Sequence, residues 1–147
     1  MNDKRVHGPA LGPEQSGVYL APVDVAAVRR AAEDAKLEWM ELDVTVARAK
    51  EALLEACARG LDFPKGFGAN WDALSDCLRD FSWRPGSGYV IFWRGGAAIA
   101  AAAPDDLAIA LEIFRDAASY WKERGRAFVV LLETPLRGLS LPRLRRS

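Results

Sequence analysis

Hydrophobic and polar positions follow two different spacings along this chain, and the changes between them separate strands from helices. Short apolar runs with branched or aromatic side chains are typical of buried strands, whereas apolar positions three or four residues apart indicate one face of a helix. Strands that alternate with helices indicate an α/β fold with a small, mostly parallel sheet. The predicted strands are residues 17–20, 37–42, 89–93 and 127–132, and the predicted helices are residues 22–35, 45–60, 70–81 and 104–124.

The pattern leaves two points open: the start of the second helix and the structure of residues 97–103. Either Asp43 or Thr45 can cap the N-terminus of the helix that Gly60 ends, so its start is open between these two positions. Its apolar face comprises Val46, Ala49, Leu53, Ala56 and Cys57. Residues 97–103 fit a short helix or an irregular segment equally well, and the pattern leaves both open.

Length and composition indicate one folded domain with a tail at each end. The chain has 147 residues, of which 50% are hydrophobic and 27% are charged, as in globular proteins that fold alone. Residues 1–16 are expected to be a disordered lead, residues 17–133 the domain and residues 134–147 a basic tail. The chain shows no apolar run of the roughly 20 residues that span a bilayer and no signal peptide. We therefore expect a cytoplasmic protein without a membrane partner.

The charge distribution argues against nucleic acid as the main partner. The formal net charge is zero, but four arginines without an acid in residues 136–147 leave a charge of −4 on residues 1–135. Phosphate binding needs a basic patch on the fold. The arginine tail can touch RNA or a membrane, although a short charged tail is more often solvated and disordered. Loss of activity on deletion of residues 136–147 would favour the RNA-binding alternative.

Residues that usually catalyse reactions or hold metals are scarce. His7 is the only histidine and lies in the lead, which removes catalytic triads and most zinc sites. Cys57 and Cys77 lack a Cys-x-x-Cys spacing, and both are expected as small buried hydrophobic residues. The glycine loop at residues 66–68 lacks the third glycine of a phosphate-binding loop. We therefore expect no enzymatic activity, no cofactor and no metal.

The predicted helix at residues 70–81 separates apolar from acidic side chains. At about 100° per residue, one stripe faces the core and comprises Trp71, Leu74, Cys77, Leu78 and Phe81. The opposite side carries acids at successive i, i+4 spacings, namely Asp72, Asp76 and Asp80. The small residues Ala73 and Ser75 at its margins allow another molecule to approach closely. This pattern fits a negatively charged docking surface.

A solvated helix face explains part of the same pattern. Arg79 can partly neutralise Asp76, and the helix dipole favours Asp72 near the N-terminus. Asp80 lacks this explanation, because it lies near the C-terminus, where the dipole disfavours an acid. A hydrolytic pair of Asp72 and Asp76 is a further alternative, ranked below binding because no cleft chemistry surrounds the two residues.

A long run around this helix resembles the signature of the barstar family of ribonuclease inhibitors. The run at residues 63–78 reads Phe-Pro-Lys-Gly-Phe-Gly-Ala-Asn-Trp-Asp-Ala-Leu-Ser-Asp-Cys-Leu. The similarity continues at residues 90–94, Val-Ile-Phe-Trp-Arg, and at residues 114–117, Phe-Arg-Asp-Ala. It covers residues 37–132, so residues 17–35 are expected to be an added strand-helix unit that extends the sheet.

The resemblance implies a parallel sheet packed with helices and inhibition by occlusion of a nuclease active site. The family's two helix carboxylates fall on Asp72 and Asp76, and the acid of its last helix falls on Asp116. The implied partner is an extracellular-type ribonuclease similar to barnase, or a related toxin with a basic active site. Carboxylates fit such a partner, because a nuclease must gather positive charge for its substrate. The expected contacts are Asp72, Asp76, Asp116, Ser75, Ala73, Gly66, Phe67 and Asp80.

Three positions depart from the family pattern. Gly66 and Ser75 stand where the family has a contact tyrosine and a contact tryptophan, and Lys65 adds a positive charge beside the site. Because aromatic anchors often carry binding energy, their loss favours an alternative in which this fold serves as an immunity or interaction protein for a different toxin or partner. Burial is favoured over partner contact for both Phe67 and Trp83.

Overall fold

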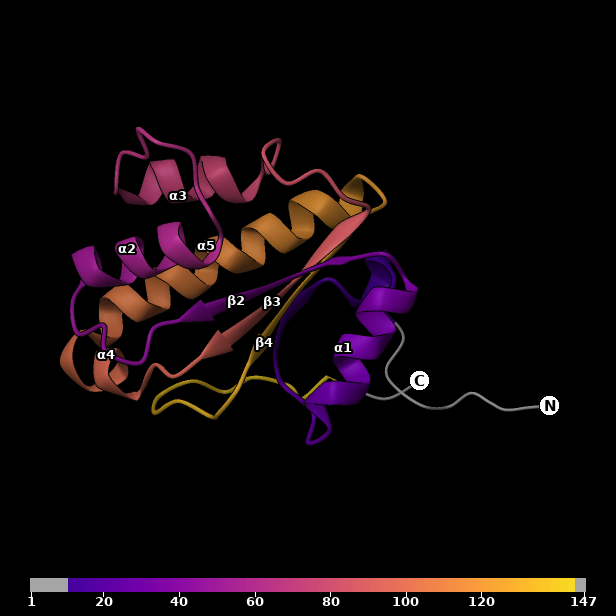
Figure 1. Cartoon of the computed structure of the whole chain (residues 1–147). Coiled ribbons are helices and arrows are strands. Elements are labelled where there is room, and N and C mark those ends of the chain that lie inside the picture. The colour runs from indigo at the N-terminus through magenta and orange to yellow at the C-terminus, as the bar shows by residue number, and fades with distance from the viewer. Residues whose placement is uncertain (1–10, 145–147) are drawn as a thin grey trace.

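The computed structural model describes residues 11–144, and a single parallel sheet runs through them. The strands lie in the order β1-β4-β3-β2 and are all parallel, and the arrows of β2 and β3 in Figure 1 point the same way. Each predicted strand is confirmed, with bounds that shift by at most one residue. The strands are β1 (Gly17–Leu20), β2 (Glu38–Asp43), β3 (Gly88–Arg94) and β4 (Ala127–Leu132).

Helices cover the two faces of the sheet unequally. One face is covered by α2 (Lys50–Gly60), α3 (Trp71–Leu78) and α5 (Pro104–Glu123), and the other by α1 (Val25–Asp34) (Figure 1). The short helix α4 (Ala97–Ala102) precedes α5. Residues 97–103, for which the sequence allowed a helix or an irregular segment, are therefore mostly helical. α3 packs on α5 and is the outermost helix on its side of the sheet (Figure 1). One side of α3 therefore remains in solvent.

Both faces of the sheet are apolar, because alternate residues of each strand point to opposite sides and both sides are covered. On the face with three helices, Ile91 and Trp93 of β3 pack in the larger core with Phe114 of α5. On the opposite face, Val129 of β4 packs in a smaller core with Val28 of α1. The added N-terminal unit thus extends the sheet at β4 and seals its second face.

The predicted start of the second helix is wrong. α2 begins at Lys50 after Ala49, whose methyl side chain cannot cap a helix. The Asp43 carboxylate instead accepts a hydrogen bond from Thr45 N at 2.9 Å and stabilises a turn at the end of β2. Val46 was expected on the apolar helix face, but it is 83% exposed. A side chain that can cap a helix can equally close a turn, and the sequence does not distinguish the two.

The segment expected as a basic tail returns to the sheet. Leu144 N donates a hydrogen bond to Leu20 O at 3.0 Å, and Leu20 N donates to Pro142 O at 2.7 Å. Leu136 and Leu144 are buried. The expectation of a fully solvated tail is therefore wrong: residues 142–144 lie beside β1, Leu136 packs in the larger core and Leu144 packs in the smaller core. Residues 145–147, with two of the four arginines, lie outside the described residues.

The N-terminal lead also differs from the expectation in its described part. Leu11 is 8% exposed and belongs to the smaller core. A turn of 3-10 helix (Pro13–Gln15) then leads into β1. Residues 1–10, including His7, lie outside the described residues. Within residues 11–144, no helix is both long and apolar enough to cross a membrane. The cytoplasmic location stays a prediction.

Candidate partner-binding surface on α3

The apolar side of α3 fixes the orientation of its acidic side. Leu74 and Leu78 have no exposed surface and pack in the larger core. Trp71 and Cys77, which were predicted on the same stripe, are only half-buried at its margins. The N-terminus is capped by Asn70, whose Oδ1 accepts a hydrogen bond from Ala73 N at 2.8 Å. The exposed side carries two acids, Asp72 and Asp76, both in solvent.

The other end of α3 is held by buried contacts. The helix ends at Leu78, earlier than predicted, and Phe81 follows in a left-handed conformation with φ at +53°. Phe81 has no exposed surface, and its ring stacks on Tyr89 with centroids 4.5 Å apart. Trp121 of α5 donates from Nε1 to Leu78 O at 2.8 Å, which satisfies a carbonyl at the helix end. α3 is therefore anchored at its last turn to both the sheet and α5.

We expect Trp121→Phe to loosen this anchor without removing the aromatic ring from the core. The substitution leaves the buried Leu78 carbonyl without its donor, so the free energy of unfolding should fall by about 1–3 kcal/mol. Urea unfolding followed by circular dichroism measures the change. The matched control is Trp83→Phe, which removes a partly buried hydrogen bond to Leu61 O and should cost less. Equal losses in the two variants would contradict a special role for the Trp121 contact.

A hollow of about 230 Å³ lies between α3 and the loop that precedes it. Its lining residues are Pro64, Lys65, Gly66, Phe67, Gly68, Ala73, Asp76 and Cys77. Phe67 is half-buried and its ring lies 4.9 Å from that of Phe63, so it closes the loop against the core. Gly66 has φ at +91° and open space where a side chain would project. A side chain at residue 66 would therefore meet no neighbouring atom, but the left-handed backbone there favours glycine.

A second hollow, of about 310 Å³, lies on the other side of α3 against α5. Its lining residues are Ser75, Arg79, Asp116, Ser119, Tyr120 and Glu123. The predicted Asp116 and Ser75 border the same hollow, although the two residues are far apart in sequence. Tyr120 and Glu123 were not included in the candidate surface predicted from the sequence. They follow Asp116 by four and seven residues, a helical spacing that places all three on one side of α5.

The structure gathers most of the predicted contact residues around one helix. Gly66, Phe67, Ala73 and Asp76 line the first hollow, and Ser75 and Asp116 line the second. Asp72 is exposed in the first turn of α3. Asp80 lies beyond the helix, where Ser82 Oγ donates to its carboxylate at 3.3 Å. This turn contact therefore accounts for Asp80, an acid that the helix dipole would disfavour at this end of the helix.

The two cysteines differ in burial but share a raised thiol pKa. Burial raises the pKa of Cys57 to about 12, and Cys57 has no exposed surface. Partial burial also raises the pKa of Cys77, with smaller contributions from the Asp80 and Asp76 carboxylates. Both thiols therefore remain protonated at neutral pH and are poor nucleophiles. Among residues 11–144, no three histidine, cysteine, aspartate or glutamate side chains form a cluster that could hold a metal ion.

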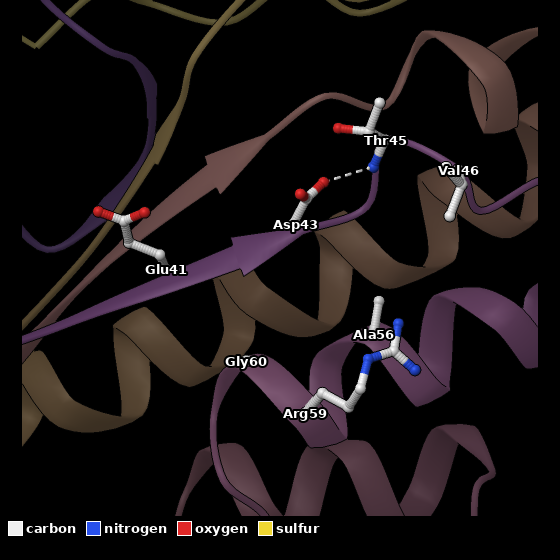
Figure 2. A pocket seen from close by; sticks show the side chains of 7 residues that line it. All are labelled: Glu41, Asp43, Thr45, Val46, Ala56, Arg59 and Gly60. Atoms are coloured by element: carbon white, nitrogen blue, oxygen red, sulfur yellow. Dashed lines mark hydrogen bonds between the residues drawn. The ribbon is translucent and has the colours of Figure 1, made fainter.

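A third hollow, of about 330 Å³, lies between the end of β2 and α2 and contains none of the predicted contact residues. Figure 2 shows Asp43 on the strand side and Arg59 on the helix side. The pKa of Asp43 is lowered mainly by its hydrogen bonds with Thr45, and to a smaller extent by the charges of Arg94 and Arg59. The Asp43 carboxylate is thus already satisfied by a turn, which accounts for its presence here.

Comparison with known protein families gives this surface a context. The family described as barstar (barnase inhibitor) matches residues 37–133, which include β2 to β4 and the whole candidate surface. A search of the curated proteins finds no match. Members of the matched family are inhibitors rather than enzymes, and the family name implies a ribonuclease-type partner in general. The match spans well over half of the sequence, with β1 and α1 outside it, and the chain therefore belongs to the barstar family.

Proposed function

We propose that this protein inhibits a ribonuclease by covering the basic active site of the nuclease with the exposed side of α3. Asp72 and Asp76 are the principal contacts in this proposal, and Asp116 is a secondary contact from α5. The loop residues Gly66 and Phe67, the small residues Ala73 and Ser75, and the turn residue Asp80 surround them. The protein acts as a binding partner without a reaction of its own.

The observation that carries this proposal is a pair of solvent-exposed carboxylates on a rigidly anchored helix. Asp72 and Asp76 are both exposed, and 77% of the Asp76 side chain is accessible. Beneath them, Leu74 and Leu78 have no exposed surface. Because the helix is already ordered, binding need not fix its backbone, and little conformational entropy is lost. The carboxylates are thus preorganised for charged hydrogen bonds.

Electrostatics explain why such a surface suits a nuclease. An active site that binds RNA phosphates concentrates arginine, lysine or histidine in a cleft, and the same charges attract a carboxylate surface during diffusion. Arginine can then form paired hydrogen bonds with a carboxylate. α3 is the outermost helix on its side, so it can approach a cleft before the rest of the protein does (Figure 1). Occlusion requires no chemistry from the inhibitor.

The proposal is tested by titrating the purified protein into a barnase-type ribonuclease assay at low and high salt. We expect inhibition that saturates at one inhibitor per enzyme and weakens as salt rises, because exposed charges are screened over about 10 Å at 0.1 M salt. A folded protein without inhibitory activity against any tested ribonuclease would contradict the proposal. Inhibition that is indifferent to salt would contradict the electrostatic part of it.

A second candidate function is immunity to, or interaction with, a different toxin or partner. The observation that favours it is the pair of hollows beside α3, since Gly66 lines one and Ser75 lines the other. Both hollows leave room for bulky side chains supplied by a partner instead of by this protein. Tight binding to a basic toxin that is not a ribonuclease, with no inhibition of barnase-type enzymes, would select this alternative.

A further inference from the structure

Arg79 places a positive charge at the edge of the acidic surface. It follows α3 directly, and its guanidinium Nη2 donates to Asp76 Oδ1 at 3.3 Å. Its Nε donates to the backbone oxygen of Ser75 at 3.2 Å. The carboxylate proposed as a principal contact therefore already has a counter-ion within the same chain.

The position of Arg79 is set partly by a second helix. Its guanidinium carbon lies 5.7 Å from the centroid of the Tyr120 ring on α5. Tyr120 is in turn covered by Arg124, whose guanidinium lies 3.5 Å from the same ring centroid and donates to Tyr120 O at 2.9 Å. Cation–π contacts of this kind are individually weak but directional. Arg79 is thus oriented by α3 and α5 together.

An ordinary helix pair in the same protein provides a comparison. Arg115 and Glu112 on α5 are also three residues apart, with a nitrogen-to-oxygen distance of 3.4 Å. The Arg115 side chain is 42% exposed, the same as that of Arg79. Arg79 differs because it also contacts a backbone oxygen and an aromatic ring on another helix. It also lines the hollow between α3 and α5, next to Ser75 and Asp116.

We infer that Arg79 is a built-in counter-ion that a basic partner must displace from Asp76 before it can pair with that carboxylate. This inference rests on the proposed function, because it concerns the same surface. A partner arginine that approaches Asp76 meets the like charge of Arg79 and must compete for the same oxygen. The pair lies at the surface, so displacement costs little, and Arg79 can move into the adjacent hollow. Arg79 therefore lowers affinity for any basic partner that offers it no acceptor in return.

The inference predicts that removing this counter-ion strengthens binding. Arg79→Gln should lower the Kd for a barnase-type ribonuclease by about two- to fivefold at low salt, mainly through faster association. The gain should shrink at high salt because it is electrostatic. Arg79→Lys keeps the charge at the end of the helix but lacks the planar fork, so its Kd should lie between those of the wild type and the glutamine variant. Stopped-flow mixing measures the association rate, and calorimetry measures the Kd.

Two controls separate a local effect from a change in net charge. Arg115→Gln removes the comparison pair on α5, and Arg30→Gln removes an exposed charge on α1, on the opposite face of the sheet. Arg79→Gln should lower the Kd more than either control. Equal effects in all three variants would overturn the inference, as would weaker binding of Arg79→Gln, which would make Arg79 a direct partner contact.

A second probe keeps this test independent of the proposed function. Hexa-arginine peptide at low salt is titrated while the amide NMR signals of Asp72 and Asp76 are followed. The peptide should shift these signals at lower concentrations in Arg79→Gln than in Arg115→Gln or Arg30→Gln. If the ribonuclease binds neither wild type nor variant, the proposed function fails, and the peptide titration still decides the role of Arg79. A peptide affinity of Arg79→Gln equal to that of the wild type would overturn the inference about Arg79.

Discussion

Replacing Asp76 with alanine is expected to remove most of the inhibition while leaving the fold intact. Asp76 is exposed on α3, and its internal contact is the surface pair with Arg79, so its loss should change stability by no more than about 1 kcal/mol. In the complex, the same carboxylate would pair with basic residues of the nuclease away from water. Truncating one member of such a buried pair costs about 3–5 kcal/mol, which corresponds to an increase in Kd of roughly a hundredfold or more.

The measurement is the inhibition constant of Asp76→Ala against the ribonuclease that the wild type inhibits. The control is Asp34→Ala, which removes one exposed acid from α1 on the other face of the sheet. This control should change the inhibition constant by less than about twofold, because distant surface charges are screened. Inhibition by Asp76→Ala that equals that of the wild type would remove α3 from the contact surface.

Replacing Phe81 with alanine is expected to give the largest loss of stability. The Phe81 ring lies 4.5 Å from Tyr89, 5.2 Å from Trp83 and 6.3 Å from Phe128, measured between centroids, and it has no exposed surface. Truncation leaves a cavity in the larger core, so the free energy of unfolding should fall by about 3–5 kcal/mol. Urea unfolding of the variant measures this loss.

Val46→Ala is the matched control for this stability measurement. Val46 is also apolar, but it is 83% exposed at the end of β2, so its truncation should change the free energy of unfolding by less than about 0.5 kcal/mol. A loss below about 1 kcal/mol for Phe81→Ala would show that the turn after α3 does not depend on this ring. The anchoring of the acidic surface would then need another explanation.

The periodic segments of the fold were predictable from sequence because the spacing of apolar residues within a segment indicates both its type and its buried side. β4 coincides with the predicted residues 127–132, and α5 with the predicted helix after residue 104 to within one residue. The start of α2 was not predictable, because Asp43 uses its carboxylate for a turn instead of a helix cap. The return of residues 142–144 to β1 was not predictable either. The segment is rich in arginine, and its leucines contact residues far away in the sequence.

The candidate surface was predictable only in part. Helical spacing placed Asp72 and Asp76 on the solvent side of α3, and the structure has both there. That Asp116 lies near Ser75 depends on how α3 packs against α5, which the spacing within one helix does not determine. The orientation of Arg79 by Tyr120 likewise arises from contacts between helices. Whether these residues touch a partner stays a prediction.

The central claim is that the acidic side of α3 occupies the same site as the RNA substrate. Competition measures this most directly: the inhibition of a barnase-type ribonuclease is determined at increasing concentrations of RNA substrate and, separately, of a nucleoside monophosphate that binds the active site. The account predicts that the apparent inhibition constant rises in proportion to either ligand, because both need the same basic residues. An inhibition constant that is independent of both ligands would place the contact outside the active site and contradict the account.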